Sequence, residues 1–176
     1  MHVSFHGPEL ERGKGRGARD EGMTQQHDML RGAAAGFAAT IPMTVVMEAM
    51  RAALPRERYR RMPPREIVDR TVEKTKEVTG EDVDLDRGDR IALATFAHFA
   101  FGTAAGAVYA STVGSRRSSV FTGVAYGLAV WAFAYGVGLP SLGLHPAATE
   151  DTTDRNELLI ASHAVWGAVL GKLSGK

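Results

Sequence analysis

Cysteine is absent from the 176 residues, which excludes disulfide bonds and thiolate metal sites. A large charge of either sign is also missing, since the formal net charge is +1, so bulk charge does not predict nucleic-acid binding. Residues 91–115 and 118–148 contain no Asp, Glu, Lys or Arg. The mean hydropathy of −0.13 would indicate a soluble protein. That average hides two long uncharged stretches, because the charged residues concentrate in residues 1–28 and 51–90.

Sequence motifs of common enzymes are missing as well. The chain has no Gly-x-Ser-x-Gly elbow, no phosphate-binding loop, no dinucleotide glycine fingerprint and no His-Glu-x-x-His. We therefore predict a protein that is not an enzyme and that uses no cofactor.

Four apolar segments remain once the charged regions are set aside. They span about residues 29–51, 91–113, 119–139 and 158–173. Uncharged runs of more than about 20 residues without a polar stripe are typical of transmembrane helices. The fourth segment is shorter than a helix that crosses a bilayer needs to be. It can still cross the membrane if Arg155, Glu157 and Lys172 lie among the lipid headgroups. The sequence thus predicts an all-α, four-helix transmembrane bundle, with the lipid bilayer as its partner.

Two charged regions flank the first segment. Residues 1–28 are rich in glycine and charge, and we predict a disordered tail there, with Met1 and Met23 as alternative starts. Residues 29–173 then form a single domain. Residues 64–78 mix apolar and charged side chains, with Glu66 and Arg70 spaced as an i,i+4 pair. This pattern predicts an amphipathic helix at the membrane surface, and a solvated helix that bridges two spans is the alternative.

Each apolar segment carries one Gly-x-x-x-Gly pair. The pairs are Gly32 and Gly36, Gly102 and Gly106, Gly123 and Gly127, and Gly167 and Gly171. Helices in lipid associate largely through close backbone contact, which small residues allow. Four such pairs predict a compact bundle, and they also leave a homo-oligomer possible.

A short pattern occurs twice. Residues 98–106 read HFAFGTAAG and residues 163–171 read HAVWGAVLG, with a histidine four residues before the first glycine in both. We take this as a sign of two related helical pairs that run in the same direction. At 1.5 Å per residue, His98 and His163 then lie at similar depth, and Glu48 and Tyr135 reach the same leaflet from the other two helices. The sequence therefore places Glu48, His98, Tyr135 and His163 in one polar layer.

Three interpretations of this layer remain open. Each histidine could bond a helix carbonyl or Tyr135 and fix the packing of the bundle. The layer could instead bind a small ligand or handle protons, because histidine titrates near neutral pH. A metal site made of two histidines and Glu48 is the third, but no His-x-x-x-His or Glu-x-x-x-His spacing supports it, and we predict no metal.

The segments RGAAAGFAATIPM, HFAFGTAAGAVY and RNELLIASHAVWGAVLG also occur in an order that is similar to a known group. The chain resembles the YagU-like family of uncharacterised bacterial inner-membrane proteins over residues 29–173, with HxxFG and HxxWG as the most specific motifs. The resemblance implies an integral membrane protein and a link to acid tolerance.

The function that we expect is that of a small multi-pass membrane protein with a structural or accessory role. The alternative is a transporter-like protein, or one that binds a small ligand or handles protons through the polar layer. Lys and Arg concentrate in residues 51–90, which predicts that this loop is cytoplasmic and that both termini are outside.

Overall fold

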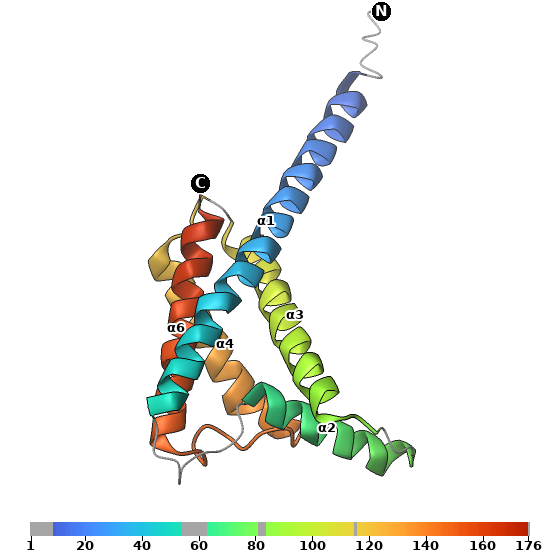
Figure 1. The fold of residues 1–176 in the computed structure, drawn as a ribbon. Coiled ribbons are helices and arrows are strands. Elements are labelled where there is room, and N and C mark those ends of the chain that lie inside the picture. The colour runs from blue at the N-terminus through green and yellow to red at the C-terminus, as the bar shows by residue number, and fades with distance from the viewer. Residues whose placement is uncertain (1–8, 54–62, 81–83, 115, 176) are drawn as a thin grey trace, which may run out of the picture.

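The computed structural model describes residues 9–53, 63–80, 84–114 and 116–175. Over these ranges the protein consists of helices and the turns that join them, with no strand. The elements are α1 (Glu9–Ala53), α2 (Pro63–Thr79), α3 (Arg87–Val113), α4 (Val120–Phe133), the π-helical turn η2 (Ala134–Gly138), α5 (Leu139–Ser141) and α6 (Thr153–Ser174). Figure 1 shows that α1 and α4 run toward one end of the molecule and that α3 and α6 run back from it.

Helix α1 is a single helix of 45 residues that begins at Glu9. The sequence predicts disorder up to residue 28, and the structure has helix over residues 9–28 instead. A helix adds one hydrogen bond for each further residue once a first turn exists, so a well-packed helix can propagate into a segment that buries little. The first part of α1 accordingly projects beyond the other helices (Figure 1).

Within the part of the chain that the structure describes, three helices are long and apolar enough to cross a membrane, as judged by length and composition. They are residues 22–53 of α1, all of α3, and the segment from α4 through α5. Helix α6 is not among them, and it carries Asp154, Arg155, Glu157 and Lys172. Ten residues of α6 are buried, and it packs against α4 and α1.

The long helices pack as two pairs, α1 with α3 and α4 with α6, and glycines of the paired helices lie against one another. Gly32 and Gly36 of α1 lie against Gly102 and Gly106 of α3, and a Cβ added to Gly36 would lie 2.9 Å from the Cα of Gly106. In the same way, the glycines of α4 at 123 and 127 lie against those of α6, and a Cβ on Gly123 would lie 2.8 Å from the Cα of Gly171. Helix α6 also packs on α1.

Several hydrogen bonds join the two pairs, and one of them comes from a buried tryptophan. The indole Nε1 of Trp166, on α6, donates to the carbonyl oxygen of Gly36, on α1, at 3.2 Å. Trp166 is buried and contacts the ring of Tyr126. Trp166 therefore packs between α1, α4 and α6.

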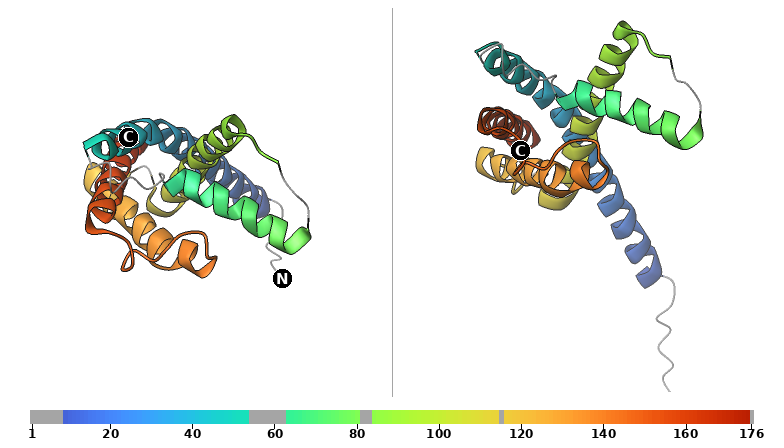
Figure 2. Two further views of the ribbon diagram at one scale, coloured as in Figure 1. Left: turned by 60° about the horizontal axis from the view of Figure 1, so that its bottom comes forward. Right: turned by 90° about the horizontal axis from the view of Figure 1, so that it is seen from below.

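Helix α2 lies across the end of the molecule at which α3 and α6 begin (Figures 1 and 2). Arg90 of α3 pairs with Asp69 of α2 at 3.0 Å. Lys74 donates to the carbonyl oxygen of Leu142 at 2.5 Å, which joins α2 to the loop before α6. Val68 of α2 is buried toward the bundle. Helix α2 is thus attached on both sides and covers this end of the bundle.

Candidate functional site

A cavity of about 240 Å³ lies between α2 and the helices that α2 covers. Its wall comes from α2, α3, η2, α5 and α6 and is mostly apolar, with Ile67, Val68 and Phe101 among the lining residues. The polar lining residues are His98, Tyr135 and His163. Three segments far apart in the sequence thus bring ring nitrogens and a phenol to one apolar space.

These three residues belong to the polar layer that the sequence predicts, and the helix starts explain why they meet. Helix α3 begins at Arg87 and α6 at Thr153, so His98 and His163 lie a similar number of residues into parallel helices. Equal rise per residue then places both imidazoles at the same height.

Glu48, the fourth predicted member of the layer, does not line the main cavity. Its carboxylate pairs with Arg51 of the same helix at 2.6 Å and is half exposed. It lines a smaller cavity of about 90 Å³, together with Thr44, Thr95 and His98. His98 therefore stands between the two spaces, and Glu48 is a neighbour of the main site and not part of it.

The two histidines differ in their hydrogen bonds. His163 Nδ1 lies 2.8 Å from the carbonyl oxygen of Leu159, one turn earlier on α6. Because a carbonyl can only accept, the proton of a neutral ring is on Nδ1 and Nε2 is left as an acceptor. His98 Nε2 is buried and has no hydrogen-bond partner among the described residues. His163 thus fulfils the packing role in part, whereas His98 has an unused polar atom.

Tyr135 sits on η2, where the helix widens to a π turn. Such turns are often found at functional sites. The carbonyl oxygen of Tyr135 accepts from the backbone N–H of Ala148 at 2.9 Å, which fixes the loop before α6. The Tyr135 ring meets His163 edge-on at 5.9 Å between centroids and meets His145 edge-on at 5.1 Å. Tyr135 therefore separates the cavity from a second polar group.

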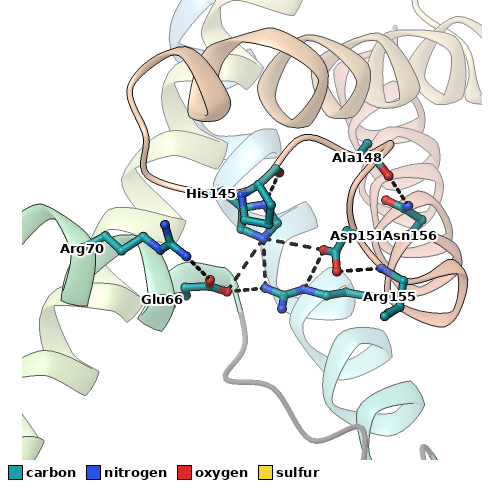
Figure 3. A network of polar contacts seen from close by, with 9 residues as sticks. Glu66, Arg70, His145, Ala148, Asp151, Arg155 and Asn156 are labelled. Carbon is teal, nitrogen blue, oxygen red and sulfur yellow. Dashed lines mark hydrogen bonds and ion pairs between the residues drawn. The ribbon is translucent and has the colours of Figure 1, made fainter.

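This second group is a buried ionic network centred on Arg155, shown in Figure 3. Arg155 Nη2 donates to Glu66 Oε2 at 2.6 Å and to His145 Nε2 at 2.9 Å. Arg155 Nε lies 3.1 Å from Asp151 Oδ2. The side chain of Asp151 is 1% exposed and that of Arg155 is 9% exposed. One guanidinium thus joins α2, the loop and α6.

Burial and charge act in opposite directions on Glu66. Burial alone would raise the pKa of its carboxyl group, but the hydrogen bond and charge of Arg155, with smaller effects of His145 and Arg70, lower that pKa below its ordinary value. Burial lowers the pKa of His145, and Arg155 lowers it further against the opposing effects of the Pro146 carbonyl, Glu66 and Asp151. The folded network therefore favours the carboxylate of Glu66 and the neutral ring of His145.

Acidification is consequently expected to loosen α2. Both pKa values are lower in the folded state than in the unfolded state, so their stabilising effect is present at higher pH and is lost as pH falls. For His145 the loss begins below about pH 6.5, the ordinary pKa of histidine. Hydrogen exchange of the α2 amides, corrected for the intrinsic exchange rates, measures this loosening. The equilibrium constant for opening of α2 should rise as pH falls, by up to about tenfold per pH unit for each proton bound.

The matched variant for this measurement is His145→Gln. A glutamine oxygen can accept from Arg155 but does not titrate, so the change just below pH 6.5 should disappear while the later change due to Glu66 stays. An identical pH profile in both proteins would show that His145 does not control the attachment of α2.

Sequence reasoning did not find this network. The sequence identified Glu66 only as the partner of Arg70, and the structure shows this ion pair at 3.3 Å. The sequence also placed Arg155 among the lipid headgroups, whereas the structure buries this residue. The available signal was the i,i+4 spacing of Asp151 and Arg155 at the start of an otherwise apolar segment. That Glu66 completes the network depends on a contact across 89 residues.

No group of three His, Asp or Glu side chains within the described ranges has a geometry suited to a metal ion. The arrangement can hold a small molecule in the apolar space and can fix the helix that covers it.

Residues 29–171 match the family described as "Protein of unknown function (DUF1440)", and the chain belongs to this family. No curated protein and no solved structure matches the chain. The match covers all the elements that build the cavity and the network.

Proposed function

We propose that this member of the family of unknown function is a small integral membrane protein that binds a small molecule in the cavity behind α2. It acts as an accessory binding protein and not as an enzyme. The observation that carries the proposal is the apolar cavity of about 240 Å³, into which two helices and η2 bring His98, His163 and Tyr135. Apolar cavities with a few convergent polar groups are the usual form of small-molecule sites.

The packing interpretation of the histidines explains less of the geometry. It accounts for the bond from His163 to Leu159. It does not account for the space beside the rings, because protein interiors are normally close-packed with few large voids. It also leaves His98 Nε2 buried without a partner, which is a cost that a bound molecule or water could offset.

Binding is also favoured over conduction. Beyond the cavity, toward the other end of the bundle, Gly102 and Gly106 lie against α1, and the ring of Tyr126 contacts the rings of Tyr109 and Trp166. Tyr109 is fully buried. The described residues therefore close the cavity on that side, as suits a site that holds a molecule.

The placement in the membrane is part of the proposal. Helix α6 would be a fourth span, packed against α1 and α4 and held to α4 by the glycine pairs, in a four-helix bundle in the bacterial cytoplasmic membrane. The excess of Lys and Arg in residues 51–90 would place α2 and the network on the cytoplasmic side. Self-association through the bilayer-facing helices would be compatible with this arrangement.

A role in acid tolerance is a second candidate function. The observation that favours it is the network of Glu66, His145 and Arg155, whose protonation would weaken the attachment of α2 over the cavity. In that case ligand binding would respond to cytoplasmic acidification.

Filling the cavity should abolish binding. Ala94 is buried and lines the cavity, whereas Ala104 is on the exposed side of the same helix. We expect the wild type and Ala104→Phe to bind naphthalene and 1-naphthol equally well, and both to bind these compounds clearly more than Ala94→Phe, whose cavity is filled. Equilibrium dialysis of protein in lipid nanodiscs, with the Ala94→Phe sample as the blank for lipid partitioning, measures this difference.

The proposed function fails if neither compound binds the wild type more than it binds Ala94→Phe. Thermal unfolding of the two variants without ligand shows whether the added ring has disturbed the fold. The two adjoining cavities give the Ala94→Phe ring room, so we expect its melting temperature to stay near that of Ala104→Phe.

A further inference from the structure

The cavity wall carries no fixed charge. None of the described lining residues is Asp, Glu, Lys or Arg. The nearby Arg155 is already engaged by Glu66, Asp151 and His145. A charged ligand would lose its hydration in the cavity without gaining a partner of opposite charge, which is strongly unfavourable. The wall therefore selects an uncharged molecule.

The wall nevertheless offers hydrogen bonds that the protein does not use. The bond from His163 Nδ1 to Leu159 leaves Nε2 as an acceptor, and this atom forms no hydrogen bond with the described residues. The hydroxyl of Tyr135, whose ring is 5.9 Å from that of His163, forms none either. A ligand hydroxyl can satisfy both, because it donates to an imidazole nitrogen and accepts from a phenol.

The size of the cavity limits the body of the ligand. An apolar cavity of about 150 Å³ holds benzene. A cavity of about 240 Å³ thus holds a somewhat larger body, on the order of ten non-hydrogen atoms.

The position of the outer wall indicates the source of the ligand. Ala97 and Phe101 line the cavity from α3, and Phe101 is also 56% exposed on the outside of that helix. Both residues lie in the middle of α3, one of the helices long and apolar enough to cross a membrane. A molecule that passes between Phe101 and η2 would come from the hydrocarbon of the bilayer and not from water.

We infer that the cavity takes an uncharged, membrane-soluble alcohol or phenol whose hydroxyl bonds to His163 Nε2 and Tyr135 and whose apolar body of about ten atoms fills the space behind α2. This inference rests on the proposed function and names the ligand class of the same site.

Three compounds with one aromatic body test the class. Naphthalene has no polar group, 1-naphthol adds a neutral hydroxyl, and 1-naphthoate adds a negative charge. In nanodiscs, with Ala94→Phe as the blank, we expect the wild type to bind 1-naphthol about five- to tenfold more tightly than naphthalene, the effect of one net hydrogen bond. We expect no binding of 1-naphthoate above the blank.

Two variants assign the hydroxyl to its partners. Tyr135→Phe removes one oxygen and keeps the ring that contacts His145 and His163. His163→Phe keeps an aromatic ring without nitrogen. In each variant the preference for 1-naphthol over naphthalene should fall to about twofold or less, while the affinity for naphthalene stays within about twofold of the wild type and shows that the cavity is intact.

The outcomes separate the inference from the proposed function. Equal binding of naphthalene and 1-naphthol, or tighter binding of 1-naphthoate, would overturn the ligand class while the binding function stands. A full preference for 1-naphthol in both variants would overturn the assigned contacts. Binding of no compound above the Ala94→Phe blank would end the proposed function itself.

Discussion

Replacing Arg155 by methionine is expected to be among the most damaging single substitutions in this protein. The change leaves the carboxylates of Glu66 and Asp151 without the guanidinium that now lies 2.6 Å and 3.1 Å from them. Breaking a buried ion pair from one side typically costs about 3–5 kcal/mol, because the remaining charge stays buried without compensation. For a chain of this size that corresponds to a fall in melting temperature of roughly 6–20 °C, measured by thermal unfolding in detergent.

Two comparisons test the cause of this loss. Arg70 pairs with the same carboxylate of Glu66, but at 3.3 Å and with a half-exposed side chain, so Arg70→Met should cost less than about 1 kcal/mol. The triple variant Arg155→Met, Glu66→Gln and Asp151→Asn removes all three charges together and should recover most of the stability. A triple variant as unstable as the single one would show that Arg155 stabilises by packing and not by charge.

A single methyl group at Gly123 is expected to lower the melting temperature by about 2–12 °C. A Cβ there would overlap the carbonyl oxygen of Gly167 and lie 2.8 Å from the Cα of Gly171. These are backbone atoms of α6, so the two helices must move apart to admit the methyl group. Such overpacking typically costs about 1–3 kcal/mol, and each kcal/mol shifts the midpoint by about 2–4 °C in a chain of this size.

The control is Gly136→Ala. An added Cβ at Gly136 meets nothing within 4 Å, so this substitution should leave the melting temperature unchanged or raise it slightly, because alanine favours helix over glycine. The same melting temperature for Gly123→Ala and Gly136→Ala would contradict the close contact between α4 and α6.

Much of the helical architecture was predictable because its causes are local. The absence of charge over residues 91–115 and 118–148 indicates membrane-length helices whatever their neighbours are, and α3 and the segment from α4 through α5 meet that description. Because each residue of a helix adds the same rise, the number of residues from the helix start gives the depth of a side chain in the molecule. It was enough to predict that His98, Tyr135 and His163 lie close together, as they do at the cavity.

Other features depend on contacts between distant segments, which no local pattern records. Glu48 has the right depth for the polar layer, but no described residue of α1 lines the main cavity, so Glu48 lies outside it. The start of α1 differs for a local reason: the charged, glycine-rich tail predicts disorder, but an existing helix extends by one hydrogen bond for each further residue, and the structure continues it to Glu9.

By itself the sequence determined the all-helical architecture, the uncharged segments, the glycine pairs and the common height of the two repeated histidines. These features follow from hydropathy and from the rise of a helix per residue, which depend only on residues close together in sequence. Only the tertiary structure decided that an open space remains beside those histidines, and that Arg155 is buried and joins Glu66 to Asp151 across three elements. The physical reason is that a cavity and a buried charge are properties of what surrounds a residue, and those surroundings come from parts of the chain that are far apart in sequence.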